Sequence, residues 1–168
     1  PVPSILSPAT GFLFRGGEYW RDAFSPLLGW SHPDYPLLLP SSVLRIWRYM
    51  GSESPAGPYL LAGVFTFGTL VVLVQSLDNL VGRPQGALAG LFLLSFSFFV
   101  SHGASQYADV PLGFYILLTN VFLRLSAGGE RRYGTAALAG MSVGFAAWTK
   151  NEGMLFLVAI GVSLIVSL

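Results

Sequence analysis

Five polar side chains in an otherwise apolar chain carry the groups that could do chemistry. His32 and Asp34 lie in "SHPDYPLLLP", Asp109 ends "SQYAD" just before an apolar run, and Lys150 and Glu152 lie in "WTKNEG". A carboxylate can act as general base toward a hydroxyl group, and a lysine can stabilise charge on a departing phosphate. Ionisable groups beside long apolar segments are costly, so by default they indicate function.

Each of these groups also has a simpler structural interpretation. Asp34 could cap the helix that follows it, because the neighbouring prolines favour extended backbone ahead of a helix. Asp109 could be a helix N-cap that accepts free amide N–H groups. Lys150 could be a lysine that reaches the membrane surface and pairs there with Glu152. The sequence leaves these alternatives open.

A metal or nucleotide cofactor has little support in the sequence. His32 and Asp34 are two residues apart and would face the same side of an extended segment. His102 and Asp109 could join them as ligands, yet a metal site needs a fuller ligand set than the sequence clearly offers. The chain has no glycine-rich phosphate-binding motif. We therefore expect no cofactor and do not favour a divalent metal.

Composition identifies the class of protein. Of the 168 residues, 53% are hydrophobic and only 10% are charged, with a mean hydropathy of +0.63, whereas soluble domains carry about 25% charged residues. The net charge of +1 gives no support for a nucleic-acid partner. The absence of cysteine excludes disulfides and thiolate metal sites. The sequence predicts an all-α integral membrane protein whose partner is the lipid bilayer.

The apolar runs divide the chain into two regions. Residues 58–168 contain runs long enough to predict four or five transmembrane helices; these runs are 58–77, 86–105, 110–123, 134–148 and 154–168. Residues 1–57 are more polar and rich in proline and aromatic residues, which predicts an external loop with interfacial helices. We expect both regions to be incomplete, because the chain begins at Pro1 without a signal-peptide pattern and stops within an apolar run.

Two shorter patterns predict local packing. "YPLLLPSSVLRIWRYMG" sets Leu44, Trp47 and Met50 against Arg45 and Arg48, which is typical of a helix at the membrane surface. "GALAG" at 86–90 and "GMSVG" at 140–144 place small residues four apart, which allows helices to approach closely in lipid.

Charge in the short loops predicts the topology. One loop carries Arg83, and the next but one carries Arg124, Arg131 and Arg132. Basic residues in short loops mark the cytoplasmic face. The N-terminal loop, Asp109 and "TKNEG" then meet on the opposite face. The sequence therefore predicts a site on the non-cytoplasmic face of the cell (inner) membrane.

Three segments of the chain resemble one enzyme family. "HPDYPLLLP" resembles the His-Pro-Pro-Leu type segment that closes the first external loop of GT-C glycosyltransferases, such as the protein mannosyltransferases and the aminoarabinose transferase of lipid A. "SQYADVPLGFYILL" resembles the segment after their third span, and "GFAAWTKNEGMLF" resembles their G-x-x-x-x-T-K-x-x-G stretch. The three segments follow the family's order and cover most of the chain.

The resemblance implies a partial GT-C fold and an inverting transfer of a sugar from a polyprenyl-phosphate donor to an external acceptor, with a carboxylate as general base. It implies catalytic roles for Asp34 and Asp109 and substrate-binding roles for His32, Tyr107, Lys150 and Glu152. Lys150 would approach the donor phosphate with Glu152 orienting it. The family's best-known aspartate follows its first span, and "PVPSILSPATGFLF" holds no carboxylate. We therefore expect the principal base upstream of Pro1 and this piece to be inactive alone.

Two other functions compete with the enzyme. In a transporter or flippase, Lys150 and Glu152 would be coupling groups at a discontinuous helix near the membrane midplane. A water-exposed "TKNEG" favours the transferase, and a buried, central one favours transport. A structural membrane subunit without chemistry is a third interpretation, which the predicted gathering of polar residues on one face disfavours.

Overall fold

The chain folds into helices throughout the part that the computed structural model describes, residues 8–27, 36–128 and 132–166. The elements are α1 (Pro8–Arg15), the 3₁₀ helix η1 (Gly17–Phe24), α2 (Leu38–Met50), α3 (Ala56–Leu80), α4 (Arg83–Ser95), α5 (Ser97–Ala104), α6 (Asp109–Ser126), α7 (Arg132–Thr149) and α8 (Asn151–Val166). These ranges contain no strand. The predicted all-α class is confirmed.

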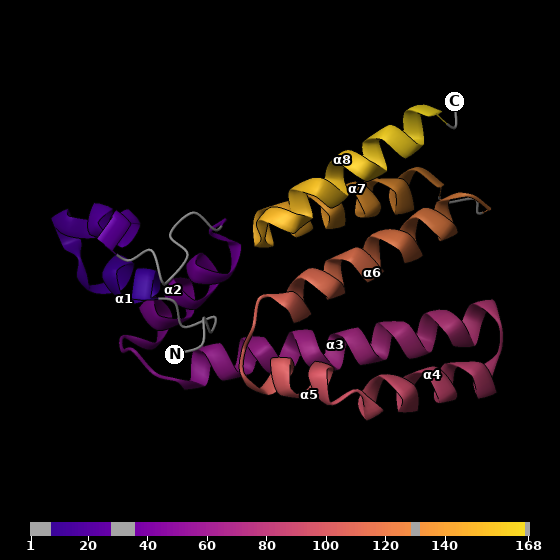
Figure 1. Ribbon diagram of the computed structural model, residues 1–168, viewed down its shortest axis with the longest axis horizontal. Coiled ribbons are helices and arrows are strands. Elements are labelled where there is room, and N and C mark those ends of the chain that lie inside the picture. The colour runs from indigo at the N-terminus through magenta and orange to yellow at the C-terminus, as the bar shows by residue number, and fades with distance from the viewer. Residues whose placement is uncertain (1–7, 28–35, 129–131, 167–168) are drawn as a thin grey trace.

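The helices form an up-and-down array with a cap at one end. Helices α3, α6, α7 and α8 run roughly side by side, with α4 and α5 together returning along α3, while α1, η1 and α2 lie at the end where α3 begins (Figure 1). The turns before α6 and between α7 and α8 lie at this same end. The turn between α3 and α4, the end of α6 and the start of α7 lie at the far end. Asp109 and Arg83 are therefore at opposite ends, as the loop charges predict.

One helix is long and apolar enough to cross a membrane. Helix α3 has 25 residues, its most apolar 18-residue window has a mean hydropathy of 2.0, and only 17% of that window is buried. A bilayer needs about 20 apolar residues. Helices α4 and α5 add a second span if the bent pair counts as one, and α8 is apolar but shorter. By length and composition, the described residues thus provide one or two spans, and the predicted four or five are not confirmed.

The predicted run 86–105 is interrupted. At Phe96 the backbone becomes extended (φ −75°, ψ 103°), and α4 and α5 meet there at a bend of 68°. Ser95 Oγ donates a hydrogen bond to the carbonyl of Phe92, 2.6 Å away. Hydroxyls make the same bond within the unbroken α3, at Thr66, Thr69 and Ser76, so the serine alone does not explain the break.

The best-packed core lies where α2 meets α3 and α6. Leu39, Val43 and Trp47 project from one face of α2, four residues apart, and pack with Phe65 of α3 and Val110 of α6. Met50, on the apolar face predicted for a helix at the membrane surface, does not join this core and is exposed. The indole N–H of Trp47 donates to the carbonyl of Ser54 at 2.7 Å, which ties α2 to the start of α3.

Small residues bring α4 close to α3. A Cβ at Gly90 would lie 2.7 Å from Cγ2 of Val74, and a Cβ at Gly86 would lie 2.8 Å from the Val74 carbonyl oxygen. The predicted close approach at 86–90 is confirmed. The same prediction for 140–144 is wrong, since a Cβ at Gly140 or at Gly144 would meet nothing within 4 Å.

Candidate functional site

A three-residue ionic cluster joins α6 to the turn between α7 and α8. Lys150 Nζ donates to Asp109 Oδ1 at 2.8 Å and lies 3.0 Å from Glu152 Oε1. Asp109 is the first residue of α6, and Glu152 lies in the first turn of α8. The positive end of each helix dipole favours a carboxylate there. Three predicted site residues, from segments 41 positions apart, therefore meet.

The lysine is sheltered, whereas the carboxylates face solvent. The Lys150 side chain is 14% exposed, that of Asp109 41% and that of Glu152 54%. Burial on its own would lower the pKa of Lys150, but the hydrogen bonds and charges of Asp109 and Glu152 raise this pKa above its usual value. Lys150 is therefore a cation at neutral pH that holds two accessible carboxylates in place.

A glycine allows the turn that presents Lys150 to α6. A Cβ on Gly153 would overlap the carbonyl oxygen of Ala146 in α7. The Gly153 amide donates to the Lys150 carbonyl at 2.9 Å, which closes the turn. The start of α8 can thus lie directly against α7, and this close approach requires glycine.

The structure decides between the alternatives for Asp109. The N-cap of α6 is Ala108, which makes no side-chain capping hydrogen bond, and the Asp109 carboxylate pairs with Lys150 instead. Asp109 is therefore not a simple N-cap. The Lys150–Glu152 pair exists, but a lysine that merely reached for the surface would be exposed, and this one is largely buried.

Tyr107 belongs to an aromatic stack just before Asp109. Its ring centroid lies 4.4 Å from that of His102, which in turn stacks on Phe98 at 3.7 Å. His102 Nδ1 is 2.9 Å from the carbonyl oxygen of Phe98. His102 thus fixes the loop between α5 and α6. No group of three or more His, Asp or Glu side chains within the described ranges could hold a metal ion.

Sequence reasoning missed Gln106 in the same loop. Its φ of +61° lies in the left-handed region, its side chain is buried, and its Oε1 has no hydrogen-bond partner in the described part of the chain. A left-handed residue other than glycine costs about 1–2 kcal/mol, and such strain is often stored at functional sites. Nothing in the sequence signals it, because glutamine is not a typical left-handed residue.

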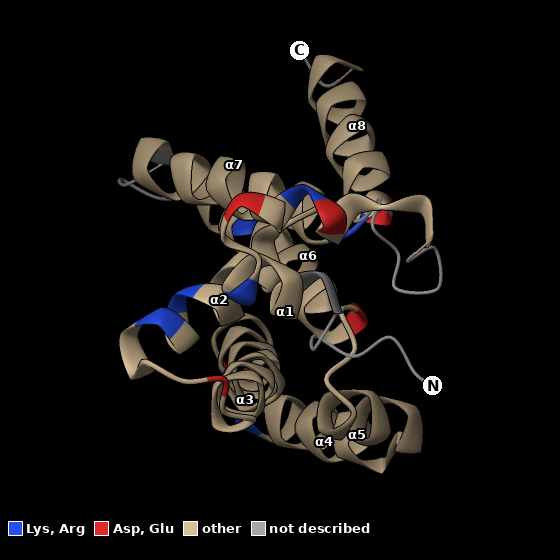
Figure 2. Ribbon diagram, turned by 90° about the vertical axis from the view of Figure 1, so that its left-hand side faces the viewer, with Lys and Arg blue, Asp and Glu red and all other residues tan. Residues whose placement is uncertain are grey.

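The predicted pair His32 and Asp34 lies outside the described residues. Figure 2 views the molecule from the end that carries α1 and α2 and shows positive residues on α2. The ionic cluster joins the start of α6 to the turn between α7 and α8. Comparison of the chain with protein-family models, curated proteins and solved structures found no match.

Proposed function

We propose that this chain is part of a membrane glycosyltransferase of the GT-C type, which transfers a sugar from a polyprenyl-phosphate donor to an external acceptor with inversion. In this proposal α3, the α4–α5 pair, α6, α7 and α8 span the membrane. The ionic cluster then lies at the non-cytoplasmic surface of the cell (inner) membrane. The proposal rests on the resemblance of three segments to that family and on the cluster described above.

The position of the Lys150–Asp109–Glu152 cluster is the observation that carries the proposal. The cluster lies at the ends of three helices, beside the α2 end of the array, and its carboxylates are about half exposed. A lipid-linked donor presents its phosphate at the membrane surface, so a transferase needs its charged groups at that depth. A cation fixed beside accessible carboxylates supports donor binding and base catalysis in one place.

In the proposed sugar transfer, each residue has its own role. The acceptor oxygen attacks C1 of the sugar as the bond from C1 to the phosphate oxygen breaks. The principal carboxylate of the full-length enzyme accepts the acceptor proton, Asp109 and Asp34 line the site where acceptor and sugar meet, and Lys150 stabilises the charge left on the lipid phosphate. Glu152 orients Lys150 through their ion pair. His32 and Tyr107 would bind acceptor or sugar.

One observation favours the transporter alternative. The α4–α5 break at Phe96 is a discontinuous helix of the kind that forms midplane sites in transporters. However, the break itself carries no ionisable residue, and "TKNEG" lies at helix ends. A flippase assay with fluorescent lipid in proteoliposomes distinguishes the two, because transport needs no acceptor and consumes no donor.

The decisive experiment is sugar transfer by the full-length gene product from a radiolabelled polyprenyl-phosphate sugar. Asp109→Asn and Lys150→Met should each reduce the rate at least 100-fold, since misplacing the reactants costs about 10²-fold and removing a charge-stabilising group costs about 10²–10³-fold. Arg83→Gln at the far end is the matched control and should keep the wild-type rate. Wild-type rates in both site variants at equal expression would reduce Asp109 and Lys150 to structural roles.

A further inference from the structure

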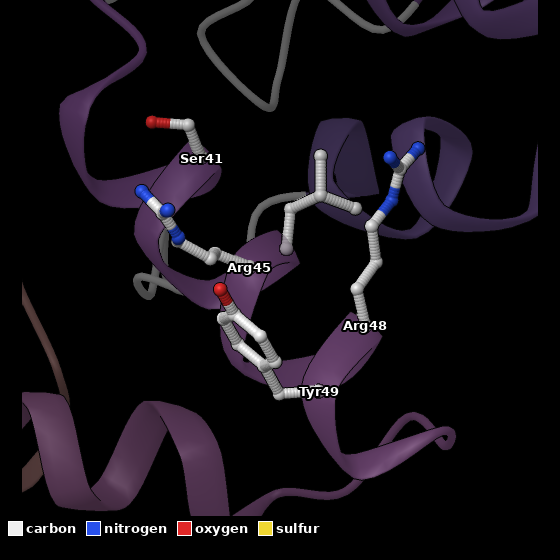
Figure 3. Close-up of a pocket in the computed structure, with 5 residues that line it drawn as sticks. Ser41, Arg45, Arg48 and Tyr49 are labelled. Carbon is white, nitrogen blue, oxygen red and sulfur yellow. The ribbon is translucent and has the colours of Figure 1, made fainter.

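A basic pocket lies on α2, apart from the ionic cluster. It has a volume of about 430 Å³ and is lined by Ser41, Leu44, Arg45, Arg48 and Tyr49. Arg45 extends toward Ser41 on one side of the pocket, and Arg48 extends along the other side (Figure 3). The pocket thus combines two cations, a phenol and an aliphatic side chain.

The packing of α2 is what turns the arginines outward. Leu39, Val43 and Trp47 bury one face of the helix against α3, which leaves Arg45 and Arg48 on the opposite, exposed side. They are three residues apart, so their side chains are neighbours on the helix surface. Neither arginine forms an ion pair with any carboxylate in the described part of the chain.

The chemistry of the pocket suits a phosphate. A guanidinium group donates several N–H bonds in a planar fork that matches phosphate oxygens. Arg45 Cζ lies 6.0 Å from the ring centroid of Tyr49, which helps to orient it. Ser41 already donates its hydroxyl proton to the Leu38 carbonyl at 3.1 Å, so the arginines carry the recognition. Leu44 adds an apolar surface beside them.

The location of α2 identifies the source of that phosphate. Only residues 51–55 separate α2 from α3, the helix that is long enough to span a bilayer, and Trp47 ties the two together. The pocket therefore lies near the end of α3, at the level of lipid headgroups. We propose that it binds the phosphate of an anionic phospholipid from the surrounding bilayer. This inference does not depend on the proposed enzymatic activity.

The test measures binding of short-chain phosphatidylglycerol to the full-length gene product in neutral detergent, by native mass spectrometry. Each arginine near an anionic lipid contributes about a fivefold gain in affinity. Replacing both, Arg45→Gln with Arg48→Gln, should therefore raise the Kd about thirtyfold. The matched control removes the same charge at the far end of the array, Arg83→Gln with Arg124→Gln, and should change the Kd less than twofold.

Several outcomes would overturn the proposal. The first is a wild-type Kd in the double variant of Arg45 and Arg48, and the second is an equal rise of the Kd in both double variants. The third is binding of short-chain phosphatidylcholine as tight as that of phosphatidylglycerol. The fourth is displacement of the lipid by millimolar inorganic phosphate, which would indicate a site for free anions. Unchanged far-UV circular dichroism confirms that the variants fold. If the double variant does not purify, Arg48→Gln alone should raise the Kd about fivefold.

Discussion

The Lys150–Asp109 pair should be the main electrostatic link between α6 and the α7–α8 hairpin. The perturbation is a double-mutant cycle with Lys150→Met, Asp109→Asn and the double variant. Methionine keeps the length and apolar stem of lysine, and asparagine keeps the shape of aspartate. The cycle therefore isolates the charge interaction across the 2.8 Å contact.

The magnitude follows from distance and exposure. At 2.8 Å the Coulomb attraction is about 1.5 kcal/mol in water and about 6 kcal/mol at an effective dielectric constant of 20. Lys150 is largely buried and Asp109 is 41% exposed, so the pair lies between these limits. Desolvation of the lysine offsets much of the gain. We expect a coupling free energy of about 1–2 kcal/mol, above the typical value of about 0–1 kcal/mol for exposed pairs.

Glu152 provides the internal comparison. Its side chain is 54% exposed, its contact with Lys150 is longer at 3.0 Å, and the two residues are close in sequence. The coupling between Lys150 and Glu152, measured with Glu152→Gln, should therefore stay below about 0.5 kcal/mol.

The assay is reversible unfolding of the full-length gene product in mixed micelles, followed by far-UV circular dichroism as the proportion of sodium dodecyl sulfate rises. A Lys150–Asp109 coupling below about 0.3 kcal/mol, or a Lys150–Glu152 coupling as large as that of Lys150 with Asp109, would refute the reasoning.

Three further predictions concern the same region. Gly153→Ala should destabilise the protein by about 1–3 kcal/mol because the new Cβ meets the α7 backbone. Gly161→Ala, in open space on the same helix, is the control and should be neutral or slightly stabilising. Equal effects of the two substitutions on unfolding in micelles would contradict this prediction. Because the pKa of Lys150 is raised in the fold, its stabilising contribution should be complete below the ordinary lysine pKa of about 10.4 and lost as pH rises through the raised value. Peptide-level mass spectrometry should therefore show slow acetylation of Lys150 at pH 9, accelerated by Asp109→Asn, and an unchanged rate would argue against the pair. Gln106→Gly should raise the free energy of unfolding by about 1 kcal/mol, because glycine adopts the left-handed conformation without strain; a loss of stability would show that the glutamine side chain is needed there.

The sequence by itself determined the helical class and the ends at which the polar groups lie. Apolar runs that alternate with polar turns predict antiparallel helices, and each crossing of the array reverses the side on which the chain emerges. Asp109 and Lys150 therefore had to reach the same end, with Arg83 at the other, as the structure shows. The pattern of "GALAG" likewise predicted a close approach to another helix, and the structure shows that this helix is α3.

Only the tertiary structure decided which groups touch. The direct bond from Lys150 to Asp109, the left-handed Gln106 and the outward turn of Arg45 and Arg48 depend on how whole helices pack. Side-chain contacts between segments 41 residues apart have no local sequence signal, because they arise from the packing of separate helices. Hydropathy did not reveal the break at Phe96, because it measures the preference for lipid and does not measure backbone conformation.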